Sequence, residues 1–226
     1  MKESVSAKDI SAVSFDLDGT ILRREFDFCL WGEGGYEGTL WKFVGKHLGC
    51  KPAEAYRLAA QLIPQVNCGR ISVKSWINHY GLKESEGEIL ARVEEPLRLY
   101  VDYTPNLIKI LRAHNLRVLL LTESSGELLN KKLDDTGIRG DFDQIYSSVE
   151  ICNDEKCPAF YEHVLREERL PAQRVIHFGD SVTKDYQIPR SLEMRAFLLH
   201  RSNGLNARVE PGHQINYLYQ ILELIK

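Results

Sequence analysis

The sequence predicts an α/β protein whose parallel sheet is interrupted by a mainly helical insert. Two observations predict this fold class. Short apolar runs alternate with helical patterns after residue 100, as expected of βαβ units. One further apolar run lies near residue 13, and the long stretch that follows it contains helical patterns without a convincing strand.

The predicted strands are short runs rich in apolar residues. They are Val13–Phe15, Arg117–Thr122, Phe142–Tyr146, Arg174–Phe178 and Arg195–Leu199. Helical patterns, with apolar residues at spacings of three and four, lie between or beside these strands. We expect these helices at Pro105–His114, Glu127–Thr136, Phe160–Glu168, Lys184–Leu192 and Ile215–Ile225.

Four more helices are predicted in the insert, separated by proline and glycine residues. They are Leu40–Leu48, Ala53–Ile63, Ser72–Tyr80 and Glu86–Tyr100, the last of which Pro96 should end or kink. We therefore expect a core domain of residues 1–22 and 101–226 and a cap domain of residues 23–100. The hinges between the domains should lie at residues 22–25 and 101–105.

Composition excludes several classes of protein. The chain has 226 residues, a hydrophobic fraction of 43% and a formal net charge of −3, so neither nucleic acid nor an anionic membrane is an expected partner. No apolar run is long enough to span a bilayer, and the first residues have no signal-peptide pattern. Five irregularly spaced cysteines predict reduced thiols. We expect a cytoplasmic protein, monomeric or homodimeric.

The segment after the first predicted strand carries the clearest chemical signal. Asp16 and Asp18 follow this apolar run, and alternation along an extended chain points both side chains the same way. Two carboxylates so close together need a cation between them, and Mg²⁺ suits one or two carboxylates with a phosphate. Gly19 then permits a tight turn close to a ligand. A solvated turn at the surface is the plainer alternative.

Four residues farther along the chain fall at corresponding places. Thr122 ends the second predicted strand, Asp180 follows the fourth, and Asp185 comes five residues later. Lys156 lies in a loop before a helix. In a parallel sheet the carboxyl ends of the strands share one edge, so these side chains should converge with Asp16. Singly, each of them is also consistent with an ordinary strand, surface or helix-end residue.

Together these motifs resemble those of the haloacid dehalogenase superfamily, in the branch with a helical cap after the first strand. The matching segments are Asp16–Thr20, Thr122, Lys156 and Gly179–Asp185. The resemblance spans nearly the whole chain. It implies a Rossmann-like, three-layer α/β/α core with a parallel sheet and a mainly α-helical cap.

The resemblance also implies a role for each residue. Asp16 would be the nucleophile, attacking phosphorus to give an aspartyl-phosphate, and Asp18 the general acid and base. Mg²⁺ would be held by the Asp16 side chain, the Asp18 main-chain carbonyl and Asp180. Thr122 and Lys156 would bind the phosphoryl oxygens. Asp185 would support the metal's water shell or orient Lys156.

Three residues depart from the family's pattern. Glu123 replaces a common Asn after Thr122, and its carboxylate would repel phosphate unless it points away or pairs with a base. Cys157 stands between Lys156 and Pro158, which puts the reach of Lys156 in question. Asn153 stands where glycine is common, and asparagine tolerates the same left-handed backbone.

The preferred function is a Mg²⁺-dependent phosphatase acting on a small phosphorylated metabolite. Asp18 favours phosphoryl transfer over dehalogenation, because a leaving halide needs no proton. A phosphomutase and a binding protein with little turnover remain alternatives. Leaving-group contacts should come from the cap, whose candidates are Arg23, Arg24, Lys42, Trp31, Tyr36 and Trp41. Ordinary cap surface or cap core is the plainer interpretation for most of these. Trp41 and Lys42, as neighbours on a helix, should not both face the site.

Overall fold

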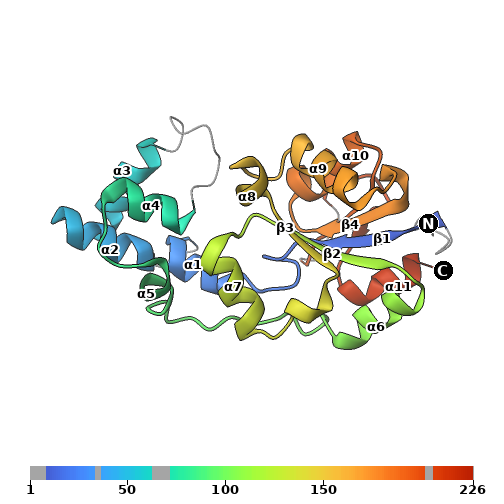
Figure 1. The fold of residues 1–226 in the computed structure, drawn as a ribbon, viewed down its shortest axis with the longest axis horizontal. Helices are drawn as coiled ribbons and strands as arrows, with labels where there is room; N and C mark the ends of the chain where they lie inside the picture. Colours follow the sequence, from blue (N-terminus) through green and yellow to red (C-terminus); the bar gives the residue numbers. More distant parts are fainter. Residues whose placement is uncertain (1–8, 34–36, 63–71, 202–205, 226) are drawn as a thin grey trace.

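The fold comprises a helical lobe and a sheet-containing lobe, shown at the left and right of Figure 1. A computed structural model describes residues 9–33, 37–62, 72–201 and 206–225. Across these ranges, every helix is too short or too polar to cross a lipid bilayer.

The centre of the larger lobe is a parallel sheet in the order β3-β2-β1-β4-β5-β6. The strands are β1 (Ala12–Phe15), β2 (Arg117–Thr122), β3 (Gln144–Ser147), β4 (Val175–Gly179), β5 (Arg195–Leu199) and β6 (Gln214–Ile215). Phe15, the last residue of β1, pairs in register with Leu120 of β2 and Phe178 of β4. The residues that follow β1 and β4 therefore emerge side by side at one edge of the sheet, as predicted.

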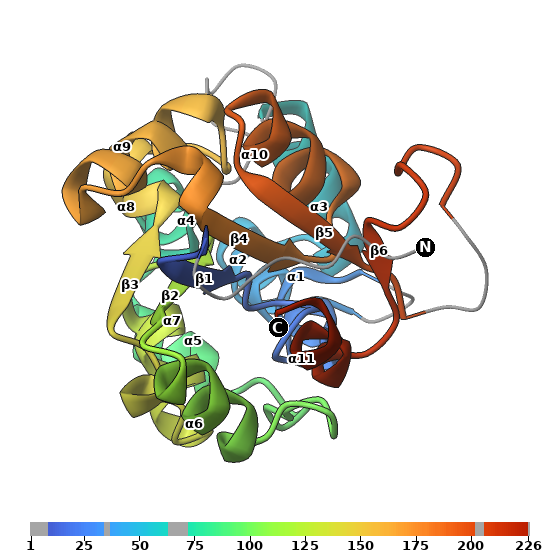
Figure 2. The ribbon, with the colours of Figure 1, turned by 90° about the vertical axis from the view of Figure 1, so that its right-hand side faces the viewer.

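Helices cover both faces of the sheet, which gives the predicted three layers (Figure 2). Alternation along β2 shows the division, because Val118 and Leu120 pack on one face while Leu119 and Leu121 pack on the other. The first face is covered by α6 (Pro105–Ala113), α7 (Gly126–Asp135) and α11 (Ile221–Leu224). The second is covered by α8 (Ser148–Cys152), α9 (Pro158–Glu168) and α10 (Ile188–Ser191). The Rossmann-like fold class is confirmed.

The helical lobe has its own apolar cluster, centred on Trp41 and Trp76. Its helices are α1 (Glu25–Trp31), α2 (Thr39–Leu48), α3 (Pro52–Leu62), α4 (Val73–Tyr80) and α5 (Glu86–Leu90). The Ser72 hydroxyl caps α4, and Ser85 with Glu88 forms a capping box at the start of α5. Only Leu128 of α7 joins this cluster from the other lobe among the described buried residues. The exact cap boundaries, residues 23 and 100, stay a prediction.

The predicted helix Glu86–Tyr100 is wrong beyond Leu90, where α5 ends. A turn follows α5, and residues 98–100 then run beside the first linker between the lobes. The Arg23 amide donates to the Arg98 carbonyl at 2.8 Å, and the Tyr100 amide donates to the Ile21 carbonyl at 2.9 Å. Pairing with a distant segment satisfies the backbone and overrides the helical pattern there.

The predicted helix Ile215–Ile225 is also shorter than expected. Ile215 belongs to β6, where it pairs with Leu199 at the edge of the sheet. A 3₁₀ turn, Leu218–Gln220, then leads into α11. The segment predicted as Lys184–Leu192 begins earlier, with a π-helix at Val182–Gln187 that continues into α10. The short helices α1 and α8 were not predicted, because each is too short to show a clear period.

Candidate active site

Asp16 lies one residue beyond β1, at the carboxyl edge of the sheet. Its amide donates to the Phe178 carbonyl at 2.9 Å, so the β1–β4 ladder still holds its backbone. The Asp16 side chain is buried, and the Thr20 hydroxyl donates to its Oδ2 at 3.2 Å. Gly19 turns the chain with φ +90°. A Cβ placed on Gly19 would lie 2.1 Å from Asp180 Oδ2, so only glycine allows this close approach.

Lys156 reaches the centre of the site despite the shifted proline. Its Nζ lies 2.5 Å from Asp16 Oδ1 and 2.6 Å from Asp185 Oδ1, with the side chain almost fully buried. The loop that delivers it begins at Asn153, which ends α8 in the left-handed conformation with φ 53°. The expectation for Asn153 is therefore confirmed. With Cys157 at the position before α9, the Lys156 ammonium still bridges two carboxylates.

Asp180 and Asp185 follow β4. The Ser181 amide donates to Asp185 Oδ2 at 2.9 Å, which folds the loop back so that Asp185 lies beneath Gly179. Asp180 instead faces the linker after β1, where Arg24 Nη2 lies 2.8 Å from its Oδ2. Arg24 is one of the predicted cap candidates, and its guanidinium contacts Asp180, a proposed metal ligand.

The carboxyl groups of the site have shifted pKa values. Burial raises the pKa of Asp16 to about 8, with added repulsion from Asp185 and Asp180, although Lys156 opposes the shift. Burial also raises the pKa of Asp180, against the attraction of Arg24. Burial acts in the same direction on Asp185, but the charge of Lys156 and the hydrogen bond from His177 outweigh it and lower the pKa of that carboxyl. At Asp16 and Asp180, burial and repulsion between the carboxylates therefore outweigh the attraction of Lys156 and Arg24.

Asp16, Asp180 and Asp185 form a group that fits a divalent cation. One carboxylate oxygen from each lies within 4.8 Å of the others. Three converging carboxylates, two of them with raised pKa values, are the oxygen donors that Mg²⁺ prefers. The Asp18 carboxylate is not part of this group, which agrees with the expectation that Asp18 would offer only its main-chain carbonyl. That carbonyl's role stays a prediction.

Asp18 points away from the metal group into a second buried cluster. Lys132 Nζ lies 2.7 Å from Asp18 Oδ1 and 2.8 Å from Asp27 Oδ1. The Ser124 hydroxyl donates to Asp18 Oδ2 at 2.9 Å. Although burial opposes it, the Lys132 charge and these hydrogen bonds lower the pKa of Asp18. Asp18 is thus held as an ionised acceptor, and Lys132 links it to Asp27 of cap helix α1.

Thr122 and Glu123 are neighbours in the sequence but lie in different surroundings. Thr122 is fully buried, its hydroxyl accepts the Ser124 amide at 3.0 Å, and it is absent from the cleft lining that the described residues form. Its part in phosphate binding stays a prediction. Glu123 pairs with Lys184 at 2.9 Å and accepts the Lys156 amide at 3.1 Å. The departure at Glu123 is therefore compensated by a base, the second of the outcomes considered above.

A buried network of hydrogen-bonded side chains holds Asp185 on the side that faces the sheet. His177, on β4, has one ring nitrogen 3.2 Å from Asp185 Oδ1 and the other 2.8 Å from the Ser14 hydroxyl on β1. Tyr161 of α9 lies 3.3 Å from the same ring and donates to the Lys184 carbonyl at 2.8 Å. Burial lowers the pKa of His177, so its neutral form bridges the two strands.

A cleft of about 430 Å³ opens from these groups toward the cap. Trp31 and Trp41 line it, as does Arg24, which places these three cap candidates at the site. Arg23 and Lys42 lie outside the lining that the described residues form, since Arg23 pairs with Glu25 and the Lys42 side chain is 48% exposed. Trp41 and Lys42 thus diverge as expected. Tyr36 lies outside the described residues.

Sequence reasoning missed Lys132, Asp27 and Ser124. A signal for Lys132 was present, because it falls four residues after Leu128 and one before Leu133, on the apolar face of α7. A lysine on such a face is buried only when it is paired. Asp27 carried no comparable signal, because α1 itself was not predicted.

The comparisons with known proteins agree with this geometry. The model of the family described as haloacid dehalogenase-like hydrolase matches residues 10–191. Over 66 residues the chain is 35% identical to haloacid dehalogenase-like hydrolase domain-containing protein 3 of Danio rerio. That match spans 28% of this chain and 27% of the relative, so the chain is aligned to about a quarter of the relative's length.

Two solved structures share the fold over almost their whole length. A HAD phosphatase from Thermococcus onnurineus superposes with a TM-score of 0.75 at 21% identity, covering 95% of this chain and 97% of that one. A 2-haloacid dehalogenase from Pseudomonas syringae superposes with a TM-score of 0.72 at 15% identity, with the same coverage. The family match, which spans most of the chain, assigns this protein to the haloacid dehalogenase-like hydrolases.

Proposed function

We propose that the chain is a Mg²⁺-dependent phosphatase that hydrolyses a small phosphomonoester through an aspartyl-phosphate. One observation carries the proposal. The buried Asp16 carboxylate lies 2.5 Å from Lys156 Nζ and within 4.8 Å of Asp180 and Asp185, at the floor of an open cleft. A carboxylate that lines the cleft beside a fixed ammonium and a candidate cation site suits attack on a dianionic phosphate.

The chain's own residues divide the reaction between them. An Asp16 oxygen forms a bond to phosphorus while the bond from phosphorus to the leaving oxygen breaks. Asp18, which is ionised before substrate binds, has to take up a proton from solvent first, and it then passes this proton to the leaving oxygen. Water then attacks phosphorus, its proton passes to Asp18, and the bond between phosphorus and Asp16 breaks. Lys156 stays beside the transferring oxygens and offsets their charge.

Asp16, Asp180 and the main-chain carbonyl of Asp18 would hold the metal, with Asp185 at its water shell. When bound, Mg²⁺ would offset the charge that Asp16 and the phosphate bring together. In the structure Arg24 forms an ion pair with Asp180, so its guanidinium has to move away from that carboxylate before a metal ion can bind there.

Asp18 favours this reaction over dehalogenation. A halide leaves without a proton, so a second acid two residues after the nucleophile has no task in dehalogenation, whereas an alkoxide leaving group needs one. The hydrogen bonds from Lys132 and Ser124 hold Asp18 in a defined position beside the cleft.

The test is hydrolysis of para-nitrophenyl phosphate with and without Mg²⁺, by wild type and by Asp16→Asn. We expect turnover by wild type with Mg²⁺ and none by the variant. Chloride release from a short 2-chloro acid, measured in parallel, should be absent. Chloride release without phosphate release, or no turnover of either compound by a folded wild type, would contradict the proposal.

A further inference from the structure

The cap side of the active-site cleft is lined by aromatic rings from four helices. They come from α1, α2, α3 and α4, and are Phe28, Trp31, Trp41, Tyr56 and Trp76. Trp41 packs edge-on against Trp76 at 5.4 Å and against Tyr56 at 5.6 Å. Its indole N–H donates to the Trp31 carbonyl at 2.7 Å, which fixes the ring. The rings are therefore held in place before any substrate arrives.

The charge of the cleft is strongly negative. Among the residues that the structure describes, eight carboxylates and three basic side chains line it. The carboxylates are Asp16, Asp18, Asp27, Glu33, Glu123, Glu155, Asp180 and Asp185, and the bases are Arg24, Lys156 and Lys184. A divalent cation and a phosphate dianion bring equal and opposite charges, so binding the two together leaves this excess in place.

The basic side chains are shared between carboxylates. Lys184 lies 2.9 Å from both Glu123 and Glu155, so a single charge serves two acids. Lys132, behind the lining, is shared in the same way by Asp18 and Asp27. A leaving group that carries its own carboxylate would add to the repulsion, whereas one that carries a positive charge would relieve it.

We propose that the leaving group of the substrate carries an ammonium group, which the cap binds between aromatic rings and the Glu33 carboxylate. This inference rests on the proposed phosphatase function. Rings with a negative π-face and a nearby carboxylate are the surroundings that attract organic cations. Glu33 lies two residues after the end of α1 at Trp31, is exposed, and lines the cleft together with Trp31.

The test compares two phosphomonoesters of the same shape. In phosphocholine the leaving group ends in a trimethylammonium, and in its carbon isostere it ends in a neutral tert-butyl group. We expect kcat/KM for phosphocholine to exceed that of the isostere by about tenfold, the factor that corresponds to about 1.4 kcal/mol. O-phosphoethanolamine should also be hydrolysed, and phosphoglycolate should be the poorest of the four. A ratio of one or less between the matched pair overturns the inference.

Two variants locate the effect. Glu33→Gln should lower the ratio between phosphocholine and its isostere several-fold. Glu54→Gln, an exposed change on α3 outside the cleft lining, should leave the ratio unchanged. Equal ratios in the two variants would overturn the part assigned to Glu33.

A binding measurement separates this inference from the proposed function. Calorimetry with Asp16→Asn and Mg²⁺ compares the affinity of phosphocholine and its isostere without any turnover. A preference for phosphocholine supports the charged leaving group even if wild type hydrolyses no phosphomonoester. Equal affinities, with para-nitrophenyl phosphate still hydrolysed by wild type, overturn the inference and leave the phosphatase function standing.

Discussion

Lys132 Nζ lies 2.7 Å from Asp18 Oδ1, so a helix that follows β2 holds the proposed general acid and base that follows β1. The same ammonium contacts both carboxylate oxygens of Asp27 on cap helix α1, at 2.8 and 2.9 Å. Only 1% of the Lys132 side chain is exposed, so water cannot replace these partners. Asp18 is thereby coupled to the position of the cap.

Lys132→Met should therefore damage both stability and catalysis. It leaves Asp18 and Asp27 buried without their cation, and removing one partner of a buried ion pair typically costs about 3–5 kcal/mol. Urea unfolding should show this loss, and turnover of para-nitrophenyl phosphate should fall by at least about tenfold under folding conditions.

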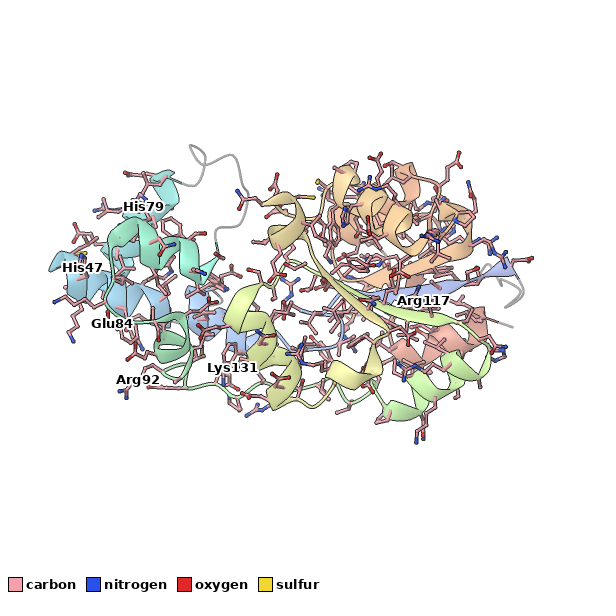
Figure 3. All side chains as sticks on the ribbon, in the orientation of Figure 1. His47, His79, Glu84, Arg92, Arg117 and Lys131 are labelled. Atoms are coloured by element: carbon pink, nitrogen blue, oxygen red, sulfur yellow. The ribbon has the colours of Figure 1, made fainter. Side chains whose placement is uncertain are left out.

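Lys131→Met is the matched control. Lys131, labelled in Figure 3, precedes Lys132 on α7 but pairs with Asp135 near the surface. Its replacement should change stability by less than about 1 kcal/mol. Equal losses in the two variants would show that the pairing of Lys132 with Asp18 has no special role.

Gly19→Ala should impair catalysis through a steric effect. The new Cβ would lie 2.1 Å from Asp180 Oδ2 and 2.5 Å from Arg24 Nε, so Asp180 has to move. A displacement of about 1 Å at a catalytic group lowers rates by about a hundredfold, which steady-state kinetics would detect. Gly49→Ala is the control, since Gly49 also has a positive φ, +70°, but no atom within 4 Å of the added carbon. Similar losses in both variants would point to backbone strain alone.

Metal removal should abolish activity reversibly. Lys156 and Arg24 contact the three carboxylates, whose oxygens lie within 4.8 Å of one another, but a phosphate dianion would add repulsion that a further cation has to offset. Dialysis against a chelator should remove turnover, and Mg²⁺ should restore it. Asp180→Asn should need at least about tenfold more Mg²⁺ for half-maximal rate, by analogy with the loss of outer-shell ligands. Full activity after chelation would argue against the metal site.

Glu86→Gln should change how stability depends on pH. Burial raises the pKa of Glu86 above 4.5, although the Leu128 amide, which donates to it at 3.3 Å, opposes the shift. As pH rises through the window between 4.5 and the raised pKa, the unfolded chain loses this proton before the folded protein does. Stability therefore falls across that window and stays lower above it.

Glutamine removes this decline, because it keeps an acceptor for Leu128 and has no proton to lose. The stability of Glu86→Gln relative to wild type, from urea unfolding, should increase between pH 4 and pH 7. Glu84→Gln, two residues earlier and labelled in Figure 3, tests whether any nearby carboxylate gives the same result. A constant difference between Glu86→Gln and wild type would show that Glu86 does not titrate as inferred.

The sequence was most informative where chemistry depends on strand ends. Asp16, Asp180 and Asp185 converge because parallel strands β1 and β4 are neighbours and end at the same edge, and this follows from an α/β pattern. Thr122 also ends a strand, but its hydroxyl accepts the Ser124 amide, so its part in phosphate binding stays a prediction. Position at a strand end does not determine where a side chain points.

Errors arose where a distant segment decides the local structure. Residues 91–100 have a helical pattern, yet residues 98–100 pair with residues 21–23 of the first linker. Ile215 fits the apolar spacing of a helix, yet it pairs with Leu199 at the edge of the sheet. The compensation of Glu123 by Lys184 likewise joins residues 61 positions apart, and local patterns carry no information on such a pair.

The pairing of the two linkers restricts how the lobes can move. Backbone hydrogen bonds join the two linkers, residues 21–23 and 98–100. Next to this pair, the Arg201 guanidinium donates a hydrogen bond to the Thr20 carbonyl at 2.7 Å. Because the two linkers are hydrogen-bonded to each other, they should bend together. The helical lobe should therefore rotate about one hinge instead of moving on two independent linkers. Opening for product release and closing over substrate would then follow a single arc.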